Sequence, residues 1–186
     1  MRFVPTPIEG AYVIYLTPFT DERGMFARLY CTSEFEAIHH NKEIVQINHS
    51  LNTEKGTVRG LHFQFPPHAE IKMIRCVRGK VFDVMVDLRK NSPSFLQWYS
   101  VELSPEAANM IYIPEGCGHG FQTLQDNSEL LYFHTAQYDR KSEGGIRFND
   151  PKLSINWPLP ARNVSEKDLN YPLLEESFIN TMNFSK

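Results

Sequence analysis

The stretch VRGLHFQF, residues 58–65, alternates between apolar side chains and others. A period of two is typical of a β-strand that turns one face to a hydrophobic core. The apolar face consists of Leu61, Phe63 and Phe65, whereas the other face carries His62 between a glycine and a glutamine. That imidazole is either a hydrogen-bonded interior group or a functional one, and the stretch alone leaves both interpretations open.

The same alternation recurs along the chain. It is clear at residues 45–51, 81–88 and 130–135, and these runs are separated by clusters of Gly, Pro, Asn and Ser. Many short strands of this kind predict an all-β sandwich or barrel. Because 186 residues suit one hydrophobic core, we expect a single domain over residues 1–186.

Helices are expected to be few and short. Ser33 with Glu36, and Ser165 with Asp168, have the spacing of a capping box, which predicts a short helix at each place. The tail from residues 155–163 onward, with Pro158 and Pro160 at its start, is loop-like. We expect it to cover one mouth of the barrel.

Composition narrows the class of protein. A hydrophobic content of 41% is typical of a globular chain, and a net charge of −3 argues against binding to nucleic acid. The sequence has neither an apolar run of membrane-spanning length nor a secretory signal pattern. Cys31, Cys76 and Cys117 are odd in number and lack CxxC spacing, so we expect free thiols and a cytoplasmic protein.

His62 and His119 are candidate metal ligands. Gly56 lies six residues before His62, and PEGCGH at residues 114–119 forms a turn before His119; together they resemble the two motif blocks of the cupin superfamily, which are small β-barrels. Metal-binding cupins carry H-x-H in the first block, but here Gln64 takes the second position, and its amide is a poor ligand for a transition metal. Two further candidates lie in a predicted loop: His68 and Glu70. We therefore expect an interior that binds an organic molecule, with no metal and no cofactor.

Several blocks occur in an order that resembles one family. They are DERGMF, the long run from VRGLHFQF to LRKNSPSF, YIPEGCGHGF, LLYFHTAQY, GGIRFNDP, INWP and SEKD. Together they are similar to the dTDP-4-dehydrorhamnose 3,5-epimerase family, from about residue 21 to residue 168. The resemblance implies a cupin-like jelly-roll β-barrel with a few short helices, a homodimer with exchanged N-terminal strands, and no metal. It also implies a nucleotide-linked 4-keto-6-deoxyhexose as substrate and a role in deoxysugar or surface-polysaccharide synthesis.

The resemblance also implies four catalytic residues. His62 matches the base that removes a proton beside the sugar ketone, which suits an imidazole near neutral pH. Asp168 matches its carboxylate partner, and Lys72 matches the cation near the enolate oxygen. Tyr132 matches the acid that returns a proton on the other face of the ring. Inversion is expected at carbon 3, carbon 5 or both.

A second set of residues is expected to bind the substrate. Arg23 and Arg59 each precede a glycine, and a guanidinium grips phosphate oxygens well, so both are expected at the diphosphate, with Arg23 reaching across the dimer. Asp83 matches a position close to the catalytic histidine. The others are expected along the nucleotide and the interior: Gln46, Asn48, His119 and Tyr138.

Arg28 departs from the family pattern, which usually has glutamate there in association with thymine recognition. An arginine donates hydrogen bonds but accepts none. It therefore suits the acceptors of cytosine, unless it turns to solvent. Both a dTDP-linked and a CDP-linked sugar remain open at this point.

Three alternatives stay open beside epimerisation. A 3,4-ketoisomerase would share the enediol step but move the ketone. A metal-dependent cupin would need stoichiometric metal at His62 and His119, and a non-catalytic barrel would bind the nucleotide sugar without exchanging its protons. In every case the sequence predicts no nucleic-acid or membrane partner.

Overall fold

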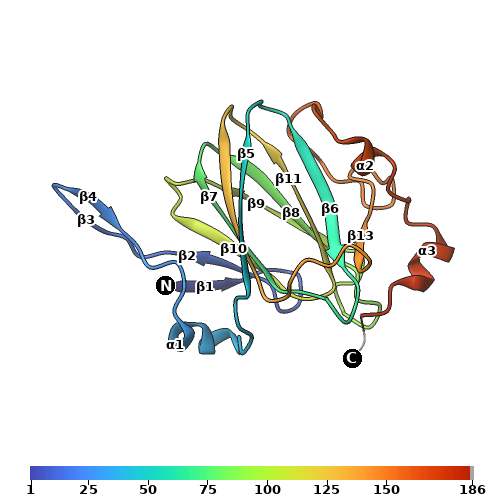
Figure 1. Cartoon of the computed structure of the whole chain (residues 1–186), viewed down its shortest axis with the longest axis horizontal. Helices are drawn as coiled ribbons and strands as arrows, with labels where there is room; N and C mark the ends of the chain where they lie inside the picture. Colours follow the sequence, from blue (N-terminus) through green and yellow to red (C-terminus); the bar gives the residue numbers. More distant parts are fainter. Residues whose placement is uncertain (185–186) are drawn as a thin grey trace.

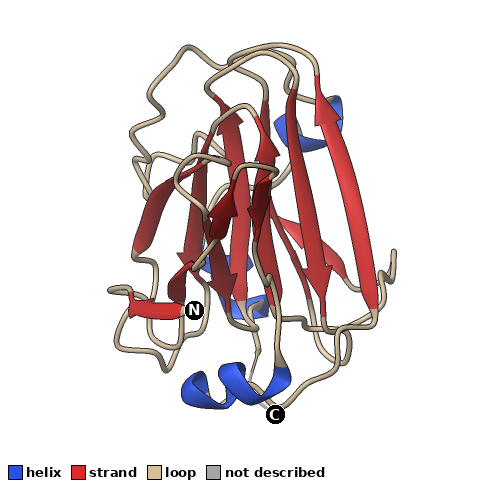
Figure 2. Ribbon diagram, turned by 90° about the vertical axis from the view of Figure 1, so that its left-hand side faces the viewer, coloured by secondary structure: helices blue, strands red, loops and turns tan. Residues whose placement is uncertain are grey.

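The computed structural model describes residues 1–184 and consists mainly of two antiparallel β-sheets with a few short helices at their margins. Figure 1 shows the strands gathered in one body, with the β3–β4 hairpin projecting from it at the N-terminal side. Figure 2 shows the strands of that body running alongside one another, with the helices outside them. The all-β prediction is therefore confirmed.

The larger sheet has six strands in the order β1-β2-β10-β7-β12-β5. Their bounds are β1 Arg2–Pro5, β2 Tyr12–Tyr15, β10 Asn109–Ile113, β7 Lys72–Arg78, β12 Ser128–His134 and β5 Gln46–Asn52. The second sheet has five strands in the order β13-β6-β11-β8-β9. Their bounds are β13 Glu143–Gly145, β6 Val58–Gln64, β11 Cys117–Thr123, β8 Val81–Asp87 and β9 Trp98–Leu103.

The remaining elements are short. The hairpin pairs β3 (Phe19–Asp21) with β4 (Gly24–Phe26). The helical segments are α1 Thr32–Phe35, the 3-10 turn η1 Glu36–Ile38, α2 Glu166–Leu169 and α3 Glu176–Thr181. Since none of them is longer than six residues, the sheets carry the fold.

Alternation along the strands divides the side chains between the interior and the two outer faces. One apolar cluster draws on both sheets, with Ile74 and Leu130 from the larger sheet and Met85 and Phe121 from the smaller one. Since His62 lies between Leu61 and Phe63, which join a different cluster on the outer face, its side chain points toward the interior. The polar face of the opening stretch is thus its inner face.

Parts of both outer faces are covered by the chain itself. Phe35 and Ile38, around α1 and η1, pack on the larger sheet against Met73 and Phe133. The C-terminal segment packs on the smaller sheet, with Leu174 and Met182 joining the cluster that contains Leu61 and Phe63. This explains why β6 and β8 are apolar on the face away from His62.

One of the two predicted capping boxes is confirmed and the other is wrong. Ser165 accepts a hydrogen bond from the backbone N–H of Asp168 and caps α2. Ser33 instead lies within α1, whose N-cap is Cys31 and has no side-chain cap. The hydroxyl of Ser33 is taken up locally by the Cys31 thiol, 3.1 Å away, so the residue does not serve the helix end.

Gly120 allows β6 and β11 to approach closely. A Cβ at this position would lie 2.7 Å from the carbonyl oxygen of Arg59 and 2.8 Å from a methyl carbon of Leu61. A backbone oxygen cannot move aside cheaply, so we expect Gly120→Ala to lower the free energy of unfolding by about 1–3 kcal/mol. Denaturant unfolding measures this change.

Gly118→Ala is the matched control for that measurement, because it lies two residues earlier in the same strand. There the nearest atom to an added Cβ is a side-chain carbon of Leu88 at 3.4 Å, which is ordinary contact. If both substitutions cost the same, the close approach at Gly120 is not what constrains the strand pair.

Candidate active site

The His62 imidazole is held by the carboxylate of Asp168. His62 Nε2 lies 2.7 Å from Asp168 Oδ1, and the second oxygen accepts the backbone N–H of Gly60 at 3.1 Å. α2 delivers this carboxylate, because its N-cap Ser165 binds the backbone N–H of Asp168. Asp168 is therefore bonded to β6 at two points, although it lies 106 positions from His62 in the sequence.

Asp168 remains ionised although it is buried. Burial acts to raise the pKa of this carboxyl, but the hydrogen bonds from His62 and Gly60 outweigh it, and the pKa falls below its usual value. A carboxylate at this position accepts the Nε2–H of His62. That arrangement leaves Nδ1 as the basic nitrogen of a neutral ring.

A second histidine–carboxylate pair lies beside the first. His119 is the register partner of His62 across β6 and β11, and its Nε2 lies 2.9 Å from Asp83 Oδ2. Asp83 thus pairs with His119 and not with His62. Full burial raises the pKa of Asp83, against the lowering effect of His119.

Tyr132 faces these histidines from the other sheet. Its ring meets the His119 ring edge-on, with centroids 6.2 Å apart. Its hydroxyl lies 3.2 Å from the Ser50 hydroxyl. Burial raises the pKa of the phenol, so Tyr132 holds its proton at neutral pH and is available as a donor.

Lys72 opens β7 and lies between β10 and β12, so a solvated edge position is ruled out for it. Its ammonium lies 3.1 Å from Glu70 Oε1 and donates to the backbone oxygen of His62 at 3.3 Å. The residue is 8% exposed. A cation is therefore fixed directly beside the His62 strand.

These side chains surround two adjoining hollows of about 310 and 300 Å³. Both hollows are lined by Asn48, His62, Lys72 and His134. The first adds Gln46 and Tyr138, and the second adds Arg59, His119 and Tyr132. The structure thus brings most of the residues expected at a site together, with Asp168 and Asp83 behind the two histidines.

Arg23 and Arg28 lie outside these hollows. The Arg23 side chain is 83% exposed in the β3–β4 hairpin, where it pairs with Asp21. The Arg28 side chain is 61% exposed and pairs with Glu34. Within one chain, then, neither arginine lines the space beside His62.

Sequence reasoning missed three charged or titratable neighbours of the site. Glu70 is a candidate from sequence only as a metal ligand, and His134 is assigned no role there. Glu143 was not singled out, yet it lines the first hollow and bonds the Tyr138 hydroxyl and the Lys167 ammonium. The alternation of β12 was the signal for His134, whereas no local pattern marks Glu143.

Gln64 has a structural role at the position where a second metal-binding histidine was considered. Its Nε2 donates to the backbone oxygen of His68, and its Oε1 accepts the backbone N–H of Asp139. The amide therefore joins the loop after β6 to the loop between β12 and β13. Over residues 1–184, no group of three or more His, Cys, Asp or Glu side chains is arranged to hold a metal ion.

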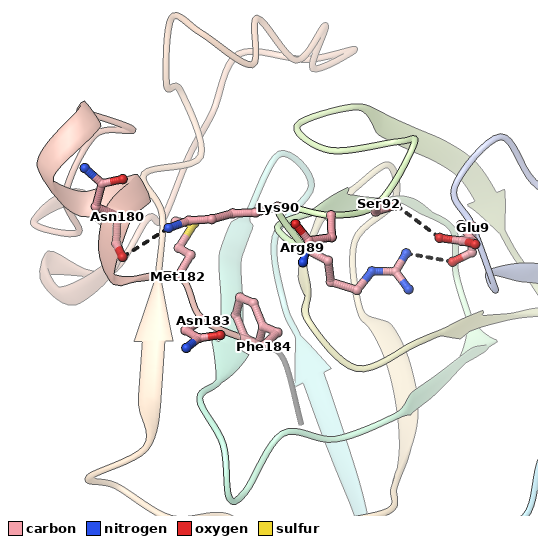
Figure 3. Close-up of a pocket in the computed structure, with 9 residues that line it drawn as sticks. Glu9, Arg89, Lys90, Ser92, Asn180, Met182, Asn183 and Phe184 are labelled. Atoms are coloured by element: carbon pink, nitrogen blue, oxygen red, sulfur yellow. Dashed lines mark hydrogen bonds between the residues drawn. The ribbon is translucent and has the colours of Figure 1, made fainter.

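A separate hollow of about 380 Å³ lies where α3 and the residues after it meet the loop that follows β8 (Figure 3). Arg89 donates to the backbone oxygen of Glu9 at 2.7 Å, and Lys90 donates to that of Asn180 at 3.1 Å. Arg89 also pairs with the buried carboxylate of Asp87. Both cationic side chains already bind other groups of the chain, so they are less free to bind a ligand. The hollow beside His62 is therefore the better candidate site.

Two smaller sequence expectations concern the thiols and the membrane. Cys31, Cys76 and Cys117 are free, as predicted. Among the helices of residues 1–184, none has the length and apolar character needed to cross a bilayer.

Comparison with known proteins agrees with the fold and the site. The family model for dTDP-4-dehydrorhamnose 3,5-epimerase matches residues 5–176. The dTDP-4-dehydrorhamnose 3,5-epimerase of Salmonella typhimurium is 43% identical over 183 residues, which are 96% of this chain and 98% of that protein. The dTDP-4-dehydrorhamnose 3-epimerase of Streptomyces niveus is 38% identical over 178 residues, covering 95% and 86% of the two chains.

A solved structure shares the architecture closely. The 3,5-epimerase of Legionella pneumophila, in complex with dTDP-4-keto-L-rhamnose, superposes with a TM-score of 0.89 and 34% identity, covering 96% of each chain. The jelly-roll sheets and the paired histidines thus define a cupin-like isomerase, an epimerase that acts on carbohydrates. The chain belongs to the dTDP-4-dehydrorhamnose 3,5-epimerase family.

Proposed function

We propose that this chain epimerises a dTDP-linked 4-keto-6-deoxyhexose by removing and returning a proton beside the ketone. The observation that carries the proposal is the His62–Asp168 pair, which faces Tyr132 across the space between the two sheets. Inversion of a carbon needs a base on one face of the ring and an acid on the other. Two sheets that face each other supply these two positions.

His62 is the base in this proposal. Asp168 accepts its Nε2–H, so Nδ1 takes the proton from the carbon beside the carbonyl. The same carboxylate then stabilises the imidazolium that forms. The Lys72 ammonium stabilises the charge that develops on the enolate oxygen, where a fixed cation has its largest effect.

Tyr132 returns a proton from the opposite side. Its pKa is raised by burial, so its hydroxyl is protonated when the enolate forms. An enolate is at least as basic as a phenolate, so the transfer is feasible. Inversion at carbon 3, carbon 5 or both depends on which carbon the sugar presents to His62, and the relatives include both a 3,5-epimerase and a 3-epimerase.

The nucleotide and diphosphate are assigned to the polar rim of the two hollows. Arg59 uses its Nε–H on Asn52, which holds its guanidinium in the second hollow with further N–H groups for phosphate oxygens. Gln46, Asn48 and Tyr138 serve the nucleotide end of the first hollow, and His119 contacts the ligand in the second. We favour dTDP over CDP because the relatives act on dTDP-linked sugars and because Arg28 turns to Glu34 and solvent.

A homodimer accounts for two apolar surfaces that a single chain leaves exposed. The β3–β4 hairpin exposes Phe19 and Phe26, and the edge strand β5 with the residue before it exposes Val45, Ile47 and Leu51. Exposed apolar residues on an arm and on a sheet edge are typical of association surfaces. We propose that the β3–β4 hairpin of one protomer packs on the partner and brings Arg23 to the partner's diphosphate site. The enzyme is proposed to act in the cytoplasm.

Solvent-hydrogen exchange tests the proposed function. The enzyme is mixed in heavy water with dTDP- and CDP-linked 4-keto-6-deoxyglucose in parallel, and NMR follows carbons 3 and 5. We expect deuterium uptake and inversion with the dTDP-linked sugar and much slower uptake with the CDP-linked one. A ketone that moves to carbon 3 would show a ketoisomerase, and an absence of exchange with both sugars would contradict the proposal.

A further inference from the structure

Glu70, Lys72 and His134 form a buried ionisable group beside the proposed base. Their side chains are 7%, 10% and 11% exposed. Glu70 uses both carboxylate oxygens, with Oε1 3.1 Å from the Lys72 ammonium and Oε2 2.7 Å from His134 Nδ1. Burying three such side chains is unfavourable unless they are well paired, so their place at the site calls for an explanation.

The strands fix this group rigidly. Lys72 and His134 are register partners across β7 and β12, so their side chains share the inner face. Glu70 lies two residues before Lys72, in the loop that enters β7. The intervening residue, Ile71, is tied to Thr135 by hydrogen bonds in both directions, which holds the backbone between the carboxylate and the ammonium.

The hydrogen bonds around His134 assign the tautomer of its neutral form. Its Nε2 accepts from the Asn48 amide at 3.3 Å, so its proton is on Nδ1 and is donated to Glu70. Burial acts to raise the pKa of Glu70, but His134 and Lys72 outweigh it, and the pKa is lowered. Glu70 is therefore a carboxylate, and it lies between the Lys72 side-chain nitrogen and the His134 ring.

The group also reaches the proposed reacting residues. Lys72 donates to the backbone oxygen of His62, and the His134 ring stacks on the Tyr132 ring with an interplanar angle of 16°. An ammonium has three N–H groups. Over residues 1–184, Glu70 and the His62 carbonyl engage two of them, which leaves the third for a ligand oxygen in the hollow.

We propose that Glu70 is a positioning residue that acts through Lys72. It supplies the buried counter-ion that keeps the Lys72 ammonium charged and aimed at the enolate oxygen, and His134 anchors Glu70 by its second oxygen. This inference rests on the proposed function, because it assigns Lys72 to the enolate. It makes catalysis depend on a carboxylate that contacts neither the base nor the acid.

Other charged or titratable groups face the same space, so the test must isolate Lys72. They come from several elements around it: Arg59 and His62 from β6, His119 from β11, Tyr132 and His134 from β12, Tyr138 from the loop after β12, and Glu143 from β13. A buried ammonium without its counter-ion loses its proton more readily. Glu70→Gln removes this counter-ion and keeps the size of the side chain; its one oxygen can accept from Lys72, and its NH2 group then faces His134 Nδ1, which must become the unprotonated nitrogen to accept it.

The experiment measures exchange kinetics of four enzymes: wild type, Glu70→Gln, Lys72→Met and the double variant. For Glu70→Gln we expect kcat to fall about tenfold, KM to change less than threefold, and the alkaline limb of kcat/KM to move to lower pH. In the Lys72→Met background, Glu70→Gln is expected to change kcat less than twofold, because residues that act through one another are not additive.

Glu102→Gln is the control, because it removes the carboxylate of a surface Lys–Glu pair, with Lys80 3.4 Å away. Equal losses from Glu70→Gln in both backgrounds, or an unchanged kcat and pH profile, would overturn the inference. If Glu70→Gln does not fold, His134→Gln replaces it. This change loosens the anchor of Glu70 but also removes the ring that stacks on Tyr132, so the alkaline limb is read and kcat is not. The limb is expected to move in the same direction by less, and an unmoved limb overturns the inference. A wild type without exchange would instead refute the proposed function itself.

Discussion

His62→Ala is expected to slow hydrogen exchange at the sugar carbons by a factor of roughly 10²–10⁴, the usual contribution of a general base. The reason is geometric as well as chemical, because the ring is held in one tautomer by a buried carboxylate at 2.7 Å. Alanine removes the imidazole that Asp168 orients. Deuterium uptake measured by NMR, at saturating dTDP-linked substrate, gives the ratio directly.

Binding and folding must be separated from chemistry in that experiment. TDP affinity is expected to stay within about threefold of wild type, because the nucleotide and diphosphate are assigned to Gln46, Asn48, Tyr138 and Arg59, whereas His62 is assigned to the sugar. His39→Asn is the matched control, since His39 is exposed and lies outside both hollows. Exchange that persists within tenfold of wild type would remove His62 as the base and turn attention to His119, which has its own carboxylate.

Tyr132→Phe is expected to separate the two halves of the reaction. Deuterium uptake should continue, because His62 can still remove and return a proton on its own face. Inversion should fall by a factor of about 10²–10⁴, because the opposite sheet no longer supplies an acid. The phenyl ring keeps the contacts with His119 and His134, so the loss is confined to the hydroxyl. Product stereochemistry and exchange are read from the same NMR spectra.

Tyr99→Phe controls for the loss of a phenol elsewhere in the barrel, since Tyr99 packs on the central apolar cluster and lines neither hollow. Uptake and inversion that decline together would contradict the assigned role of Tyr132. They would show that its hydroxyl is already required when the first proton leaves.

The fold was predictable because its strands alternate, but alternation alone does not say which face is inside. Leu61 and Phe63 suggested the core side of β6, yet they pack outward under the C-terminal segment, and the polar face with His62 points inward. An apolar face needs only some apolar cover. Here the C-terminal segment packs on that face, and the alternation of the strands does not predict this contact.

The site was predictable only in part, for a similar reason. His62, Lys72 and Tyr132 lie on strands, so their faces follow from local spacing. Asp168 could be assigned only by resemblance, because 106 residues separate it from His62. Glu70 lies in a loop, where spacing says nothing about direction, and its pairing with Lys72 and His134 emerges only when β7 and β12 are in register.

The position of Asp168 has a consequence for how the enzyme is made. Its carboxylate comes from α2, which is synthesised after every strand of both sheets, and it bonds two groups of β6. A nascent chain that has completed all its strands therefore still lacks the Asp168 carboxylate, which selects the tautomer of His62. The carboxylate can reach His62 only after the segment that follows β13 has packed on the outside of the smaller sheet.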